Sequence, residues 1–285
     1  MNGVQLLKGS KKYLCPQCGR KRFVPFVNGN GEIMTDDKGV MFGRCDREQE
    51  CGFFYKPNGK KIIVQRLQDR TEKELIWFDN SVLADTCSTW NNLIAYLGGL
   101  LPTEAFADTL QRYHVQTIGN DGVVWWQISI ANVVRTGKVM RYNADGHRQH
   151  YGGTTWVHVL DKYKPYRHGE ELRQCFFGEH LLNIDKRPVA VVESEKTAIV
   201  MASIETNYLW LACGGSQMLK DERRLSVLQD RKVLLIPDEG QYYNWAATAR
   251  KYNWECVELY GKGIDKGADL ADIFIKVLEN KDLLK

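Results

Sequence analysis

Short apolar runs alternate with amphipathic segments in the last third of the chain. The apolar runs cover residues 188–192, 208–213, 232–236 and 256–260. Helices are predicted after these runs, from Glu195 to about Ile204, after Ser216, near Tyr242–Tyr252 and from about Leu270. Four buried strands that alternate with helices predict a parallel sheet covered on both faces.

The middle of the chain carries a helical pattern followed by a β pattern. Residues 81–117 predict two helices, of which the first ends at Gly98 and the second is capped by Thr103. From Val123 onward, β-branched and aromatic residues predict strands at residues 123–128, 138–142 and 155–159. Turn residues at 135–137 and 143–146 predict that these strands form hairpins.

Two pairs of cysteines lie in the first sixty residues. Cys15 and Cys18 are separated by two residues, Cys45 and Cys51 by five, and a glycine follows each pair. Strands predicted at residues 22–27 and 40–42 lie between the pairs. This pattern is typical of a zinc ribbon, and four cysteines leave no open position for water, so the Zn²⁺ is expected to be structural. Four unrelated buried thiols are the alternative.

The composition and the N-terminal sequence favour a cytoplasmic location. The 285 residues are 44% hydrophobic and contain no run of 18 apolar residues, so no membrane span is expected. The N-terminus shows no signal-peptide pattern, so a cytoplasmic location is expected. Thiols stay reduced there, which favours metal binding over disulfides. The remaining cysteines are scattered and are predicted to be small core residues: Cys87, Cys175, Cys213 and Cys256.

Positive charge is concentrated in two parts of the chain. Residues 1–66 carry a net charge of +7 and the remainder a net charge of −3. Residues 131–168 contain 7 Lys and Arg, 2 Asp and Glu, and several aromatic residues. This segment fits either a nucleic-acid strand, with cations on phosphates and rings on bases, or a hydrophobic sheet with a solvated basic face. The candidate nucleic-acid or nucleotide contacts are Arg47, Arg135, Lys138, Arg141, Tyr142, Arg148 and Lys196.

Acidic residues follow three of the four predicted parallel strands. Glu193 follows the first strand, Asp238 and Glu239 follow the third, and Asp265, Asp269 and Asp272 come after the fourth, whereas Gly214 follows the second. The carboxyl ends of parallel strands meet at one edge of a sheet, so these acids are expected to share a cleft. Mg²⁺ or Mn²⁺ would relieve their repulsion. The alternative is that the acids only cap helices.

The motifs around these acids resemble those of a Toprim domain over residues 188–277. The resemblance rests on Glu193 with its neighbours Ser194–Ala198, on the glycines at 214–215, and on Asp238. It implies that Glu193 and Asp238 are catalytic and metal-site residues. The second Asp of the family's metal-binding pair falls on Gly240, with Glu239 one residue earlier. Asp269 and Asp272 resemble a later acidic motif and complete the predicted site.

The order of the predicted modules resembles that of small bacterial-type DNA primases of plasmids, phages and integrative elements. Residues 90–119 and 176–182 add to this likeness, although primase zinc fingers often include a histidine. The expected fold is α/β, or α+β overall. Its expected parts are a zinc ribbon over residues 1–60, a helical and β-rich middle over 61–185, and a Toprim-like domain over 186–285.

The resemblance implies a metal-dependent nucleotidyltransferase that acts on single-stranded DNA with NTPs. One alternative is a catalytically weak or inactive DNA-binding accessory protein of replication, and another is a Toprim nuclease. No phosphate-binding loop of the form Gly-x4-Gly-Lys-Ser/Thr occurs in the chain, so any helicase is expected to be a separate protein. The sequence makes no prediction about the oligomeric state.

Overall fold

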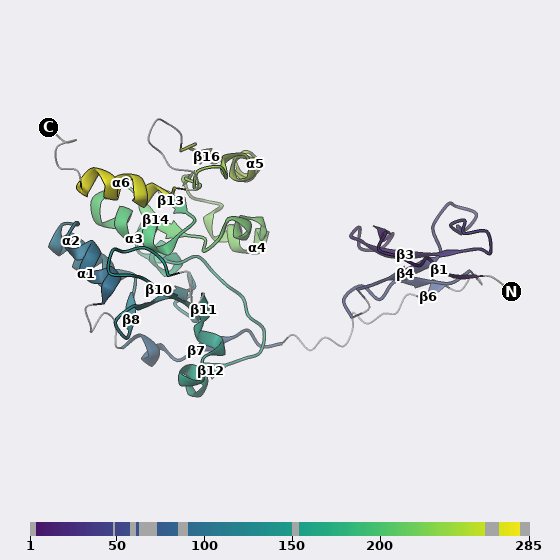
Figure 1. Cartoon of the computed structure of the whole chain (residues 1–285), viewed down its shortest axis with the longest axis horizontal. Coiled ribbons are helices and arrows are strands. Elements are labelled where there is room, and N and C mark those ends of the chain that lie inside the picture. The colour runs from purple at the N-terminus through teal and green to yellow at the C-terminus, as the bar shows by residue number, and fades with distance from the viewer. Residues whose placement is uncertain are drawn as a thin grey trace. The chain divides into compact units, whose positions relative to one another are not determined.

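The computed structural model describes residues 4–47, 49–57, 61–62, 73–84, 91–149, 154–259 and 268–279, with only the backbone described at 61–62 and 216–217. The chain divides into two compact units, Met1–Glu72 and Lys73–Lys285 (Figure 1). Trp90, Tyr151, Asp265 and much of the stretch between residues 57 and 73 lie outside the described residues. None of the described helices has the length and apolar character needed to cross a membrane.

The first unit is an antiparallel sheet. Its strands are β1 (Gln5–Leu6), β2 (Tyr13–Leu14), β3 (Lys21–Val27), β4 (Gly43–Cys45), β5 (Phe54–Tyr55) and β6 (Lys61–Ile62). The order is β1-β3-β4-β5-β6, and β2 also pairs with β3. The strand predicted at residues 40–42 begins later, at Gly43. The Asp36 carboxylate accepts hydrogen bonds from the backbone of Lys38 and Val40, which holds this stretch in a turn until just before the strand.

The core of the first unit is small. Its buried cluster consists of Cys15, Phe23, Cys45 and Phe53, so half of it is cysteine. Val24, Val27 and Phe42 are buried outside this cluster. A core of this size is small for an independently folded domain. The first unit therefore depends on additional stabilisation, which bound metal provides in small domains of this kind.

The second unit contains an antiparallel sheet that differs in part from the prediction. Its strands are β7 (Trp77–Phe78), β8 (Gln116–Ile118), β9 (Gly122–Ile128), β10 (Val134–Arg141), β11 (Thr155–Trp156) and β12 (Arg167–His168). The order is β12-β7-β10-β9-β8, and β11 also pairs with β10. The turn predicted at 135–137 is wrong, because the chain reverses at 129–133, where Asn132 adopts a left-handed conformation. The strand predicted at 155–159 is shorter, since residues 157–159 form a 3-10 turn.

The helices of this part of the chain come between β7 and β8 in the sequence. A 3-10 helix covers Asn80–Leu83, and the α-helices are α1 (Asn92–Gly98) and α2 (Thr103–Arg112). The Asn91 side chain caps α1 by accepting a hydrogen bond from the Ile94 backbone. The predicted cap at Thr103 is wrong, because Pro102 precedes the helix and Thr103 is its first residue. Proline fits at this end of a helix, where no backbone donor is needed.

The predicted parallel sheet is confirmed. Its strands are β13 (Val189–Val192), β14 (Leu209–Ala212), β15 (Val233–Leu235) and β16 (Glu255–Cys256), in the order β14-β13-β15-β16. The α-helices that follow its strands are α3 (Glu195–Ile204), α4 (Glu222–Leu225), α5 (Tyr242–Tyr252) and α6 (Leu270–Glu279). The segment after Ser216 forms 3-10 turns around the short α4. The chain is thus a mixed α/β protein with an N-terminal zinc ribbon.

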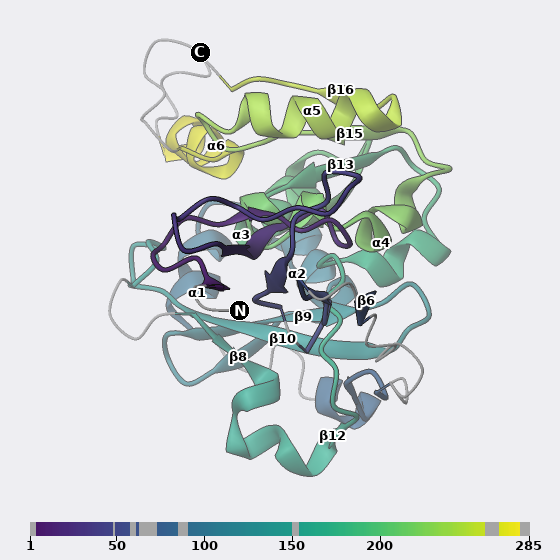
Figure 2. The same cartoon turned by 90° about the vertical axis from the view of Figure 1, so that its right-hand side faces the viewer.

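Strand β9, which runs beside β10 (Figure 2), is buried on both faces and joins two cores. Val123 and Trp125 belong to the core that α1, α2 and the parallel sheet share. Val124 and Trp126 alternate with them and pack in a second core with residues such as Phe78. The first of these cores has members from Leu93 to Ile275, so it extends across the predicted domain boundary at 185/186. The boundary itself stays a prediction.

Candidate functional site

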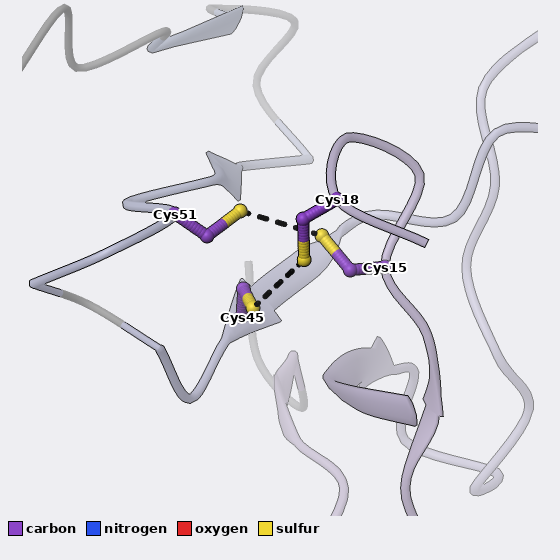
Figure 3. Close-up of side chains that lie close together, drawn as sticks. All are labelled: Cys15, Cys18, Cys45 and Cys51. Carbon is purple, nitrogen blue, oxygen red and sulfur yellow. Dashed lines mark hydrogen bonds between the residues drawn. The ribbon is translucent and has the colours of Figure 1, made fainter. Parts of the chain in front are cut away.

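The four predicted zinc ligands lie together in the first unit (Figure 3). Cys15 and Cys18 stand on a tight turn after β2, which the Gly19 backbone closes by donating a 2.9 Å hydrogen bond to the Cys15 carbonyl. Gly19 has a φ of +67°, a conformation that glycine adopts without the steric cost of a Cβ. The glycine after the first pair is thus needed for the turn itself.

The second pair of cysteines is held by a longer loop. Cys45 ends β4, and the Arg47 carbonyl accepts hydrogen bonds from the backbone of Glu50, Cys51 and Gly52. These three hydrogen bonds to one carbonyl bend the loop, so that Cys51 lies close to Cys45 although five residues separate them. The Arg47 guanidinium, a predicted phosphate contact, is ion-paired with Glu50.

The spacing of the sulfur atoms fits one zinc ion. The Sγ atoms of Cys15 and Cys51 are 3.7 Å apart, those of Cys18 and Cys45 are 4.0 Å apart, and all four lie within 4.8 Å of one another. Tetrahedral zinc with bonds of about 2.3 Å places its sulfur ligands about 3.8 Å apart. The structure thus supports a structural Zn²⁺ held by these four side chains.

Their protonation differs from one cysteine to the next. The Arg20 backbone hydrogen bond lowers the pKa of Cys18 to about 7, whereas burial raises the pKa of Cys45 to about 12 and also raises the pKa of Cys51. Zinc binds thiolates, so metal binding at this site releases protons that burial otherwise retains.

A cavity of about 380 Å³ lies in the second unit, at the carboxyl ends of the parallel strands. Glu193 enters it directly after β13, Asp238 follows the β15 segment, and Asp269 precedes α6. The structure therefore brings these three predicted acids together. Its other lining residues are Lys138, Met140, Tyr142, Arg148, Ser194, Glu195, Lys196 and Gly214.

Asp238 shows the electrostatic effect of this arrangement. Burial raises its pKa to about 8, and the negative charges of Glu193, Asp269 and Asp272 add to the increase. A carboxyl group of this kind is protonated at neutral pH unless a cation compensates its charge. The cavity thus provides acidic oxygen ligands, which suit a hard divalent cation.

The acids near α6 also make hydrogen bonds of their own. The Thr197 hydroxyl donates a 2.6 Å hydrogen bond to Asp269, whose other carboxylate oxygen accepts one from the Asp272 backbone. Asp272 in turn accepts from the Asp269 backbone and from the Lys196 ammonium, which is 3.2 Å away. The capping alternative thus holds for this pair, while Asp269 lines the cavity as well.

Three predicted positions lie apart from the cavity lining. Asp272 lines a neighbouring cavity of about 330 Å³, which shares Lys196 with the first. The Glu239 backbone donates a hydrogen bond to Ala268, and its side chain is not among the lining residues. Gly240 is exposed and has a φ of +81°. Among the residues that the structure describes, the four cysteines form the one group of three or more His, Cys, Asp or Glu side chains placed closely enough to hold a metal ion.

The predicted basic and aromatic contacts divide into two groups. Lys138, Tyr142, Arg148 and Lys196 line the cavity. Arg148 is exposed, and its guanidinium donates a 2.7 Å hydrogen bond to the Thr154 hydroxyl. Arg135 and Arg141 do not line the cavity: Arg135 donates to the Ile76 carbonyl, and Arg141 is ion-paired with Asp121.

Glu195 is a site residue that the sequence prediction missed. It is the first residue of α3, where the sequence pattern predicts only a helix start, yet it is buried and ion-paired with Lys138. The sequence feature that points to Glu195 is the second acid in the run Glu193-Ser194-Glu195. A carboxylate that is buried after a strand needs a partner of opposite charge.

Comparison with known proteins adds a family. A profile described as a domain of unknown function, DUF6371, matches residues 91–239. The chain belongs to the DUF6371 family. The matched segment contains strands β8 to β12 of the antiparallel sheet and the first three strands of the parallel sheet, with Glu193 and Asp238 among its residues.

A second profile, described as a zinc beta-ribbon finger, matches residues 4–64 and agrees with the four-cysteine cluster. A zinc ribbon suggests nucleic-acid binding for this part of the DUF6371 protein. No match is found among curated proteins.

Proposed function

We propose that the chain is a primase-like nucleic-acid-binding protein, a metal-dependent nucleotidyltransferase that acts on single-stranded DNA. The observation that carries this proposal is the convergence of Glu193, Asp238 and Asp269 on one cavity that also contains Arg148 and Lys196. The resemblance of the surrounding motifs to those of Toprim domains supports the same reading. We further propose that the domain around this cavity is Toprim-like.

In this proposal Glu193, Asp238 and Asp269 hold the cation, with Glu239 and Asp272 close in sequence as further candidates. Bound Mg²⁺ or Mn²⁺ supplies positive charge that stabilises a phosphoryl group during transfer. Water would complete the coordination of Mg²⁺ at these carboxylates, as is usual for this ion. Arg148, which is exposed at the cavity, binds the phosphates of an NTP.

The first unit offers a surface for the single strand. The rings of Phe26 and Phe54 are stacked, with centroids 6.0 Å apart and planes at 22°. The Lys56 ammonium lies 5.1 Å from the Phe54 centroid, and Lys11 lies over Tyr13. Half-exposed rings with adjacent cations suit stacking on bases and contact with phosphates. This supports DNA binding by the zinc ribbon.

Template-directed incorporation of labelled NTPs on single-stranded DNA tests the enzymatic part. The wild type is expected to extend a primed strand in Mg²⁺ or Mn²⁺, and Glu193→Ala is expected to lower the rate at least 100-fold. The matched control is Glu255→Ala, which removes an exposed acid on β16. Equal, low incorporation by the wild type and Glu193→Ala would exclude the enzyme.

A DNA-binding accessory protein without catalysis is the second candidate, and Gly240 is the observation that favours it. The position that carries the second metal-binding Asp in Toprim domains has no side chain here. This candidate predicts salt-sensitive binding of single-stranded DNA that survives Glu193→Ala and Asp238→Ala, with no measurable Mn²⁺ binding. Cleavage of DNA in the same assay would instead identify a Toprim nuclease.

The cellular setting follows from the same proposal. A primase-like protein of a mobile element works in the cytoplasm beside a helicase, and we propose that here the helicase is a separate protein.

A further inference from the structure

A buried ion pair connects the two sheets at the candidate cleft. Lys138 lies on β10 of the antiparallel sheet, and Glu195 begins α3 after the first parallel strand. The Lys138 ammonium lies 2.9 Å and 3.2 Å from the two Glu195 carboxylate oxygens. The side chains are only 12% and 2% exposed, so this pair is largely removed from water.

The third contact of this ammonium reaches the turn after β14. Lys138 donates a 3.3 Å hydrogen bond to the Gly214 carbonyl. The Lys138 ammonium thus contacts Glu195 Oε1, Glu195 Oε2 and Gly214 O, all within the protein. The Glu195 carboxylate compensates the positive charge of Lys138, and the ammonium is largely shielded from water.

The same turn holds the strand end that carries Glu193. The Gly214 backbone donates a 2.9 Å hydrogen bond to the Glu193 carbonyl. A Cβ at Gly214 would lie 3.2 Å from Glu195 Oε1, so the carboxylate packs directly against this glycine. The buried Arg224 guanidinium donates a 3.0 Å hydrogen bond to the neighbouring Cys213 carbonyl. Lys138 and Arg224 thus both hydrogen-bond to the backbone of this turn.

We propose that Lys138, through its ion pair with Glu195, is a positioning residue that fixes the Gly214 turn and thereby the Glu193 strand end at the cleft. The inference rests on the proposed function for the meaning of that cleft. It replaces the expectation that Lys138 contacts nucleic acid, because Glu195 already compensates the positive charge of this lysine inside the protein.

The test uses the full chain with the double variant Lys138→Met/Glu195→Gln, which removes both charges together. Replacement of a buried ion pair by neutral side chains is often tolerated, so this variant is expected to fold. The matched control is Lys251→Met/Glu222→Gln, which neutralises an exposed ion pair elsewhere in the second unit. Thermal melting confirms that each variant is folded.

The first readout is hydrogen exchange at the Cys213 and Gly214 amides, followed by mass spectrometry. Exchange is expected to become at least 10-fold faster in Lys138→Met/Glu195→Gln and to stay unchanged in the control. This measurement needs neither metal nor DNA, so it decides the positioning role even if the proposed function fails. Unchanged exchange at these two amides would overturn the inference.

The second readout is Mn²⁺ affinity, for which the double variant is expected to bind about 10-fold more weakly than the wild type, as for other groups that orient metal ligands. If the wild type binds no Mn²⁺, the proposed function fails and the exchange result still stands. The third readout is the salt dependence of oligo-dT binding by Glu195→Gln and by the double variant. Equal slopes are expected; a slope lower by about one in the double variant would make Lys138 a phosphate contact and overturn the inference.

Discussion

The Thr197 hydroxyl donates a 2.6 Å hydrogen bond to the Asp269 carboxylate and so links the first turn of α3 to the residue that precedes α6. Both side chains are buried. The two helices belong to segments that are more than seventy residues apart in the sequence. This contact fixes one of the three acids of the cleft relative to the helix that follows Glu193.

Loss of this hydroxyl is expected to destabilise the protein. Thr197→Val keeps the shape of the side chain but leaves a buried carboxylate oxygen without its donor, which costs about 1–3 kcal/mol. Thr197→Ser retains the donor and is the matched control. Chemical denaturation measures both free energies of unfolding, and equal values for Val and Ser would show that the hydrogen bond does not matter for stability.

Zinc is expected to determine whether the first unit folds. Cys45→Ser removes a buried ligand, so the variant is expected to lose the bound metal and the dispersed NMR signals of residues 4–57. Cys256→Ser, which changes a half-buried thiol outside the cluster, is expected to retain one zinc per chain. Elemental analysis gives the zinc content, and a full equivalent of zinc in Cys45→Ser would contradict the four-cysteine site.

Stability is expected to depend on pH through Asp238. Its pKa is raised to about 8 in the folded chain, above its ordinary value of 3.8. Below pH 3.8 the group is protonated in both states. Between pH 3.8 and 8 the unfolded chain loses this proton first, so stability falls as the pH rises and levels off above about 8.

The variant Asp238→Asn is expected to reduce that fall, whereas Glu255→Gln, a change at an exposed acid, is not. Thermal melts from pH 5 to 9 measure the difference. A cation at this cleft competes with the same proton, so Mn²⁺ affinity is expected to rise over this range. Parallel melting profiles for the wild type and Asp238→Asn would contradict the raised pKa.

Position 240 offers a test of the metal site by gain of function. Nothing lies within 4 Å of where a Cβ at Gly240 would stand, so a side chain fits there. The φ of +81° costs a non-glycine residue about 1–2 kcal/mol. Gly240→Asn carries this backbone cost without the charge and is the matched control. Gly240→Asp is expected to bind Mn²⁺ several-fold more tightly than Gly240→Asn, as measured by titration calorimetry; equal affinities would place residue 240 outside the metal site.

Some parts of the structure could be predicted because their signals are local. The cysteine spacing identifies the zinc ribbon, since the pairs must lie on short turns whatever the rest of the chain does. The continuous apolar runs, such as Val189–Val192, identify buried parallel strands. The topology of such a sheet then places residues that follow its strands at one edge, which is why Glu193 and Asp238 meet in one cavity.

Other features depend on contacts that no local pattern reveals. The reversal at 129–133 uses a left-handed Asn132, and the register shift between Val134 and Thr136 lets β10 continue through the predicted turn. The partners of Lys138 lie 57 and 76 residues away, so its role as an ion-pair partner emerges only from the fold. The positive charge of Lys138, taken alone, predicts a nucleic-acid contact at the surface.

The two buried faces of β9 also determine how the second unit unfolds. Trp125 and Trp126 are adjacent in sequence but belong to different cores, and both are fully buried. A strand cannot leave one core and remain in the other. The two cores are therefore expected to melt in a single cooperative transition, and fluorescence of either tryptophan would report the loss of both.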